Sequence, residues 1–64
     1  MIQKIVRLPE VKSTTGLSRS SIYLRMSQDE FPKSISLGGR AVGWFEEDIK
    51  NWLEQKRKES RGEV

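Results

Sequence analysis

The side chains best suited to binding chemistry gather in one stretch of the sequence, Thr14–Met26, which reads TTGLSRSSIYLRM. It offers hydroxyls, guanidinium groups and a phenol, which donate and accept hydrogen bonds and supply positive charge. If the residues from Ser18 onward form a helix, at roughly 100° per residue, Ile22 and Met26 share its inner side. The outer side then holds Arg19, Ser20, Tyr23 and Leu24, with Arg25 on the flank. A short helix with these groups outward has the chemistry that a DNA recognition helix needs.

This helix needs a turn and a cap that hold it in place. Gly16 takes a left-handed backbone without strain, so it can end a preceding helix and reverse the chain. Ser18 is a good N-cap, because its hydroxyl can accept from a backbone N–H two or three residues on. Leu17 and Ile22 have the spacing of a hydrophobic staple around that cap. The sequence therefore predicts a tight turn followed by a helix over Ser18–Gln28.

A first helix is predicted over Leu8–Thr15, ahead of the turn. Pro9 suits the first helical turn, where its missing N–H costs nothing, and Glu10 favours the positive end of the helix dipole. So short a helix must be held by packing. The preceding residues 1–7 contain several β-branched side chains and form either a strand or an arm that packs on the core.

A β-hairpin is predicted over Ser34–Trp44, because two alternating runs flank Gly38 and Gly39. A two-residue loop at these glycines predicts the pairs Leu37 with Arg40, Ser36 with Ala41 and Ile35 with Val42. That register gathers one apolar face, made of Ile35, Leu37, Val42 and Trp44. A three-residue loop would split the apolar set and is disfavoured. Arg40 falls at the tip, where Gly39 lets the backbone approach a partner closely.

A third helix is predicted over Phe45–Arg57. Its amphipathic stripe consists of Phe45, Ile49, Trp52 and Leu53. Phe31 is expected to plug the core from the loop before the hairpin. The two tryptophans are assigned to the core in preference to stacking on nucleic acid. Residues 59–64 are expected to form a frayed tail, and residues 1–64 a single domain.

Positive charge is unevenly distributed along the chain, whose formal net charge is +3. Residues 1–43 hold seven basic and three acidic residues, whereas residues 44–64 hold five basic and six acidic residues. The positive excess therefore lies with the first two helices and the hairpin. Such an asymmetry suits a polyanionic partner for that part of the chain.

Composition excludes several classes of function. The chain contains no cysteine and no histidine, so disulfides, thiol chemistry and an ordinary zinc site are excluded, and no cofactor is expected. Glu46, Glu47 and Asp48 form an acidic cluster, but the dipole of the third helix explains their position. The protein is therefore not expected to be an enzyme. No apolar run approaches the roughly 20 residues that span a membrane, and a cytoplasmic location is expected.

Several motifs, in the right order, resemble the AlpA family of small phage and prophage DNA-binding regulators. They are LPEV at 8–11, TGLSRSSIY at 15–23, FPK at 31–33, LGGRAVGW at 37–44 and EEDIKNWL at 46–53. The resemblance implies a winged helix-turn-helix fold, mainly α with a two-stranded wing, related to excisionases and MerR-type activators. It also implies a transcriptional regulator, often one that governs prophage integrase expression or excision.

One departure from the family pattern concerns Leu24 and Arg25. Family members commonly have a basic residue directly after the Ile-Tyr pair and an apolar residue next, whereas here Leu24 precedes Arg25. This order turns Arg25 toward the flank of the helix, where it meets phosphate or an acidic neighbour. Leu24 either has no special role, contacts a thymine methyl group or packs under the hairpin.

The predicted function is sequence-specific binding of double-stranded DNA and regulation of transcription. The residues expected to contact DNA are Ser18, Arg19, Ser20, Tyr23, Leu24, Arg25, Gly39 and Arg40. One such module buries only about 600–1,000 Å² on DNA, so self-association on adjacent sites or help from a phage integrase is expected. Two alternatives remain open: an excisionase-like factor that bends attachment-site DNA, and an adaptor that binds protein instead of DNA.

Overall fold

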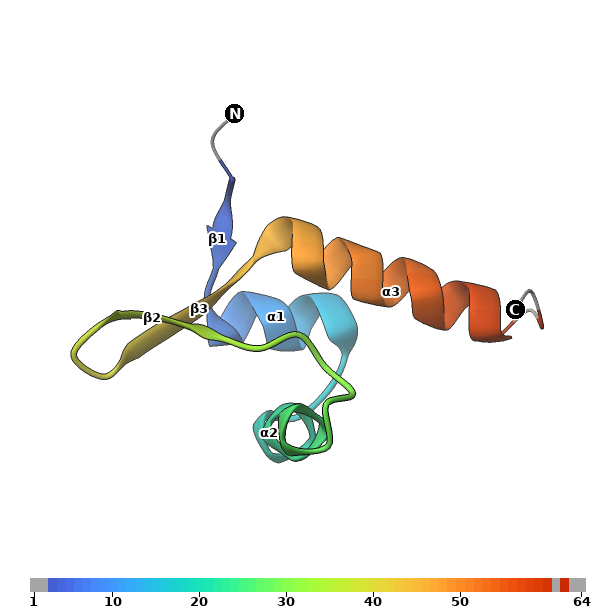
Figure 1. Ribbon diagram of the computed structural model, residues 1–64, viewed down its shortest axis with the longest axis horizontal. Coiled ribbons are helices and arrows are strands. Elements are labelled where there is room, and N and C mark those ends of the chain that lie inside the picture. Colours follow the sequence, from blue (N-terminus) through green and yellow to red (C-terminus); the bar gives the residue numbers. More distant parts are fainter. Residues whose placement is uncertain (1–2, 61, 63–64) are drawn as a thin grey trace.

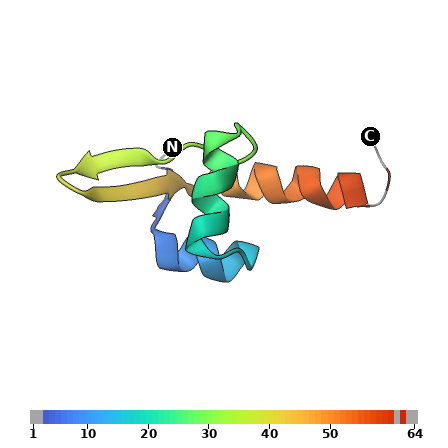
Figure 2. The same ribbon diagram turned by 90° about the horizontal axis from the view of Figure 1, so that it is seen from below.

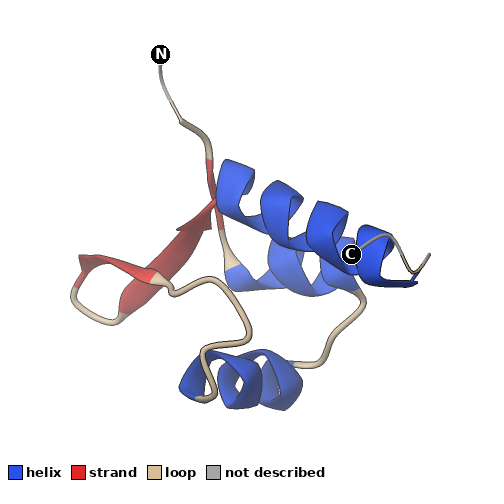
Figure 3. Ribbon diagram, turned by 45° about the vertical axis from the view of Figure 1, so that its right-hand side comes forward, coloured by secondary structure: helices blue, strands red, loops and turns tan. Residues whose placement is uncertain are grey.

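The computed structural model, which describes residues 3–60 and 62, has three helices that lie against one end of a small antiparallel sheet (Figure 1 and Figure 3). The elements are β1 (Ile5–Val6), α1 (Leu8–Thr15), α2 (Arg19–Ser27), β2 (Ile35–Gly38), β3 (Ala41–Phe45) and α3 (Glu46–Ser60). The hairpin of β2 and β3, residues 35–45, extends to one side of the helices and is called the wing below (Figure 1). The predicted winged helix-turn-helix fold is confirmed. None of the helices in the described part of the chain is long and apolar enough to cross a membrane.

The residues before α1 form a third strand, which answers the question that the sequence left open. The strand order is β1-β3-β2, and β1 pairs with β3 in the register Ile5↔Phe45 and Val6↔Trp44. Val6 and Trp44 face the core and are almost fully buried. The arm is therefore an integral part of the sheet, although residues 1–2 lie outside the described residues.

The predicted register of the hairpin is wrong. The turn lies at Gly39 and Arg40, and the observed pairs are Ile35↔Gly43, Ser36↔Val42 and Gly38↔Ala41, with an irregularity between Ser36 and Gly38. Leu37 is the extra residue of this bulge, and it is 43% exposed. Gly38, with a φ of 106°, provides the backbone freedom that the bulge needs.

The bulge distributes the apolar side chains of the wing over both faces of the sheet. Val42 and Trp44 face the core, whereas the register places Ile35 opposite Gly43 on the outer face. An added Cβ at Gly43 would lie 2.7 Å from Cγ2 of Ile5 and 3.2 Å from Cδ1 of Leu37. The single apolar face predicted for the hairpin therefore does not exist. Val42 and Trp44 lie on the core side of the sheet, whereas Ile35 lies on the other side, where Gly43 leaves room for Ile5 of β1.

The core joins every element except β2. Its buried residues are Val6, Val11, Ile22, Phe31, Trp44 and Ile49. Phe31 is 4% exposed, as predicted, and its ring packs edge-on against Trp52 at a centroid distance of 4.8 Å. The indole N–H of Trp44 donates to the carbonyl oxygen of Pro32 at 3.0 Å, and that of Trp52 donates to the carbonyl of Glu30 at 2.8 Å. Trp44 is fully buried and Trp52 half-buried against the core, so both tryptophans have the predicted structural role.

α3 begins one residue later and ends three residues later than predicted. Phe45 belongs to β3, because it pairs with Ile5 and because the N–H of Glu46 donates to the carbonyl of Lys4 at 2.8 Å. The helix continues through Ser60, two residues into the stretch 59–64 that was expected to fray. Residues 61, 63 and 64 of that stretch lie outside the described residues.

Replacing Gly43 by alanine is expected to destabilise the domain by about 1–3 kcal/mol, because the new methyl group must displace Ile5 or the carbonyl of Val6 at 3.2 Å. Urea denaturation followed by far-UV circular dichroism measures the loss. Ile5→Ala removes the Cγ2 atom in the way, so Gly43→Ala should cost less in that background. An equal cost in both backgrounds would show that the close packing of β1 on Gly43 is not the reason.

Candidate nucleic-acid interface

The turn between α1 and α2 is held by local hydrogen bonds. Gly16 has a φ of 74°, and its N–H donates to the carbonyl of Lys12 at 2.8 Å, which ends α1. The hydroxyl of Thr15 donates to the carbonyl of Val11 at 2.7 Å and accepts from the N–H of Leu17 at 3.3 Å. The predicted left-handed turn is confirmed, and it fixes where α2 begins.

α2 is capped as predicted. The hydroxyl of Ser18 accepts from the backbone N–H of Ser21 at 3.2 Å, and Gln28 is the C-cap. Leu17, next to the cap, packs against the core that contains the fully buried Ile22. The cap and the packing of Ile22 together set the rotation of the helix about its axis.

The outward face of α2 displays the predicted polar side chains. Arg19 and Ser20 are exposed, and Tyr23 and Leu24 are 37% and 57% exposed. The guanidinium carbon of Arg19 lies 5.6 Å from the centre of the Tyr23 ring, a cation–π distance that favours one position of the arginine. The hydroxyls of Ser18 and Ser20 lie 3.3 Å apart. Leu24 does not pack under the wing, so only its other two interpretations remain.

Arg25 lies on the flank of α2, half-buried. Its Nε is covered by the protein and has no hydrogen-bond partner in the described residues. Among those same residues no carboxylate lies within ion-pair distance of its guanidinium, since the six ion pairs involve other cations. The acidic neighbour expected for Arg25 is therefore not found, and a phosphate contact stays a prediction.

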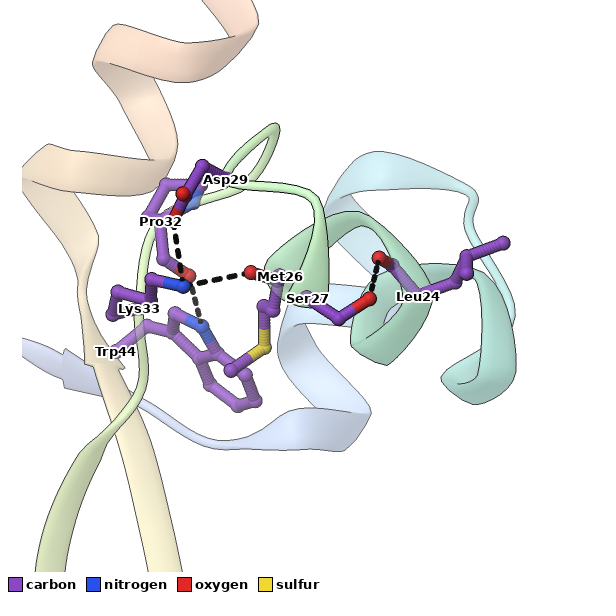
Figure 4. Close-up of polar contacts among 7 residues, drawn as sticks. All are labelled: Leu24, Met26, Ser27, Asp29, Pro32, Lys33 and Trp44. Carbon is purple, nitrogen blue, oxygen red and sulfur yellow. Dashed lines mark hydrogen bonds and ion pairs between the residues drawn. The ribbon is translucent and has the colours of Figure 1, made fainter.

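A lysine fixes the C-terminal end of α2 (Figure 4). The ammonium group of Lys33 donates to the carbonyl of Met26 at 2.7 Å and pairs with the Asp29 carboxylate at 2.9 Å. The hydrogen bond and the charge of Lys33 hold the pKa of Asp29 below its ordinary value. The stabilisation is present above the ordinary carboxyl pKa and is lost as the pH falls through the lowered value. Both groups are exposed, so the contribution is small at high salt.

Gly39 and Arg40 form the exposed turn at the tip of the wing. Gly39 has a φ of 57°, which a side chain would resist. Figure 2, a view from the side of α2, shows the wing reaching out to the left of that helix. The predicted contacts on α2 and on the wing therefore belong to two separate elements.

Ion pairs divide the basic residues into two groups. The paired cations, each within 4 Å of a carboxylate, are Lys4, Lys33, Lys50, Lys56 and Arg57. In residues 3–60, the basic side chains without such a pair are Arg7, Lys12, Arg19, Arg25, Arg40 and Lys58. Five of these six lie before α3, on α1, α2, the wing or the step into α1. The uncompensated positive charge of the described residues therefore lies mostly on the part of the chain that precedes α3.

Arg7 is a member of this group that the sequence analysis did not single out. It is exposed, and its Nε donates to the carbonyl oxygen of Val42 on the wing at 2.8 Å. Thirty-five positions separate the two residues, so no local pattern could have revealed the contact. A prediction that the arm pairs with β3 would have placed Arg7 beside the wing.

The acidic cluster at the start of α3 has a structural explanation. Glu46 pairs with Lys4 at 3.6 Å and with Lys50 at 3.8 Å. Glu46, Glu47 and Asp48 occupy the first helical turn, where negative charge stabilises the helix. In the described part of the chain, no three acidic residues come close enough together to hold a metal ion.

Comparison with known proteins gives a family match over most of the chain. The sequence model of the family described as "Prophage CP4-57 regulatory protein (AlpA)" matches residues 4–57. The DNA-binding transcriptional activator AlpA of Escherichia coli (strain K12) is 39% identical over 61 residues, covering 86% of this chain and 87% of the relative. The uncharacterized protein ORF88 of Enterobacteria phage P4 is 41% identical over 51 residues, which is 80% of this chain. The chain spans only 58% of the length of that phage protein.

Proposed function

The chain belongs to the AlpA family of prophage regulatory proteins, and on that premise we propose that it binds double-stranded DNA sequence-specifically and regulates transcription. The genes it controls are those of prophage integration or excision. The relative in Escherichia coli is named as a DNA-binding transcriptional activator. The observation that carries the proposal is the outward face of α2, which exposes hydrogen-bonding groups and Arg19, a cation with no ion pair in the described residues.

In the proposed complex, α2 enters the major groove. Arg19 bonds to a guanine edge or to a phosphate, and Ser20 and Tyr23 bond to bases or backbone. Leu24, more than half exposed, meets a thymine methyl group. The cap hydroxyl of Ser18 lies at the end of the helix that points toward the DNA backbone.

The wing makes the second contact. Figure 1 shows α2 protruding below the other elements, with the wing extending sideways above that level. A helix seated in the major groove would therefore bring the wing to the flanking backbone. There Arg40 reaches a phosphate or the minor groove, and Gly39 allows a close approach.

One copy supplies a small interface, about 600–1,000 Å² for a module of this size. The proposal therefore includes several copies on adjacent sites, or a phage integrase as a partner. Footprinting of the bound sites distinguishes the roles. Single or paired sites at promoters support transcriptional regulation, whereas arrays inside attachment sites support an excision factor.

Binding to DNA is tested by fluorescence anisotropy with labelled duplexes at several salt concentrations. The proposal predicts that the logarithm of the affinity falls steeply and linearly with the logarithm of salt concentration, because phosphate contacts release counterions. An absence of duplex binding at low salt would favour a protein-binding adaptor instead, and duplex binding without salt dependence would contradict the proposed phosphate contacts.

Substitutions at Ser18 separate the stability of α2 from its contact with DNA. Ser18→Ala should destabilise the domain by about 1 kcal/mol, because the N–H of Ser21 loses its acceptor. Ser18→Asp keeps a good cap, and so keeps the stability, but its negative charge should weaken DNA binding. Ser18→Asn, a neutral cap, is the matched control. Thermal unfolding and anisotropy are measured on all three variants, and equal DNA affinity of the Asp and Asn variants would contradict the placement of the cap beside DNA.

A further inference from the structure

The geometry points to a phosphate-binding site at Arg7, where β1 turns into α1 beside the wing. Its ligand is a phosphodiester of the DNA backbone. The inference rests on the proposed function and adds a third contact to those of α2 and the wing. In the DNA complex the same side chain also holds the wing in place relative to α1, through its hydrogen bond to Val42.

The guanidinium group of Arg7 is already positioned. β1 is only two residues long, so beyond Val6 the edge of β3 has no strand beside it. The side chain of Arg7 takes that place, because its Nε donates to the carbonyl oxygen of Val42 at 2.8 Å. An arginine has one N–H at Nε and four at its two terminal nitrogens. One donor is therefore used to fix the group, and the four donors that suit a bidentate phosphate contact remain.

Nothing in the described residues occupies those remaining donors. Lys4, three residues earlier, is bound by the carboxylates of Glu10 and Glu46, but within residues 3–60 and 62 no carboxylate lies within 4 Å of Arg7. The side chain is exposed. A fixed, exposed and unpaired guanidinium loses little freedom when an anion binds, which favours binding.

The charge of Arg7 does not serve the helix that follows it. Arg7 is the N-cap residue of α1, and its side chain makes no capping hydrogen bond. A cation near a helix N-terminus opposes the helix dipole, whereas Ser, Thr, Asp or Asn would cap the helix. The hydrogen bond to Val42 needs a donor but no charge. Neither helix capping nor the hydrogen bond to Val42 accounts for the positive charge of Arg7, whereas binding of an anionic ligand does.

The position of the junction suits a backbone contact. In Figure 2 the step from β1 to α1 lies beside the base of the wing and to the left of α2. In Figure 1 the same step lies at about the height of the wing, while α2 protrudes below both. With α2 in a groove, the junction and the wing would meet the phosphates that border it.

The test compares the salt dependence of duplex binding for the wild type, Arg7→Gln and Arg57→Gln. Each loss of a phosphate contact should lower the slope of log affinity against log salt by about 0.9, equivalent to about an eightfold loss of affinity at 0.1 M salt. We expect this change for Arg7→Gln, on specific and random-sequence duplexes alike. Arg57 is exposed on α3 and pairs with Glu54 at 3.8 Å, so Arg57→Gln removes an equal charge and should leave the slope near the wild-type value.

If Arg7→Gln keeps the wild-type slope and affinity, the phosphate site is overturned, whether or not the thermal stability falls. That result would leave the role of α2 intact. If the wild type itself fails to bind duplexes, the proposed function falls together with the inference. A measurement on the wild type covers the case in which Arg7→Gln does not fold. The ¹⁵N resonances of the Arg7 side chain should shift when duplex is added, while those of Arg57 stay in place, and unchanged Arg7 resonances would also overturn the site.

Discussion

Arg19→Ala is expected to weaken binding to the specific site by about 10- to 100-fold while the domain stays folded. A well-placed arginine contact with a base is worth about 1–3 kcal/mol of discrimination, and this arginine is held against Tyr23 at 5.6 Å on the exposed side of α2. Binding to random-sequence DNA should fall much less, because phosphates rather than bases supply most of that affinity. The two affinities are measured by anisotropy at one fixed salt concentration.

Arg57→Ala is the matched control for Arg19→Ala, since it removes the same charge from α3, away from α2. Arg40→Ala tests the wing in the same assay and should weaken specific and non-specific binding by similar factors, because the contact proposed for Arg40 is with the DNA backbone. Unchanged affinity for both Arg19→Ala and Arg40→Ala would contradict the proposed docking of α2 and the wing. A fall in thermal stability that matches the loss of affinity would assign Arg19 to the fold instead.

Trp44→Ala is expected to unfold the domain. The side chain is fully buried in the centre of the core, and its indole N–H satisfies the carbonyl of Pro32 at 3.0 Å. Truncation of a buried tryptophan costs about 3–5 kcal/mol. A core of this size rarely supplies more than about 3–5 kcal/mol, so the cost is as large as the whole free energy of unfolding. Far-UV circular dichroism and urea denaturation should show a loss of helix and of cooperative unfolding.

Two further variants show whether packing or the hydrogen bond dominates at this position. Trp44→Phe keeps most of the apolar volume but leaves the carbonyl of Pro32 without its donor, so the loss should be smaller, about 1–3 kcal/mol. Leu37→Ala removes an apolar side chain that is 43% exposed on the wing and should change stability little. If Trp44→Ala unfolds at the same urea concentration as the wild type, the core assigned here is wrong.

The first two helices could be predicted because their ends are fixed locally. Gly16 ends α1 because its backbone is left-handed, and Ser18 caps the start of α2 because its hydroxyl accepts from the N–H of Ser21, three residues on. The periodicity around Ile22 then determines which side chains face outward. For these reasons the exposure of Arg19, Ser20 and Tyr23 follows from the sequence alone.

The sheet could not be predicted in the same way, because its register depends on residues far apart in the chain. The partner of Phe45 is Ile5, at the other end of the domain, and this pairing keeps Phe45 out of α3. The same strand places Ile5 against the face of β3 that carries Gly43, where Leu37 of the bulge also lies, and this arrangement cannot be seen in the alternation of the hairpin residues alone. Arg7 was missed for the same reason, since its contact with Val42 exists only after β1 has joined the sheet.

The central claim is that the outward face of α2 reads a DNA sequence, and the most direct test is a genome-wide map of bound sites in the native host. The map is made for the wild type and for Arg19→Ala at equal protein levels. The prediction is a set of wild-type sites that share one short motif near prophage genes, with that set lost or much weakened in Arg19→Ala. Bound sites that share no motif, or a motif occupied equally by Arg19→Ala, would contradict sequence reading by α2.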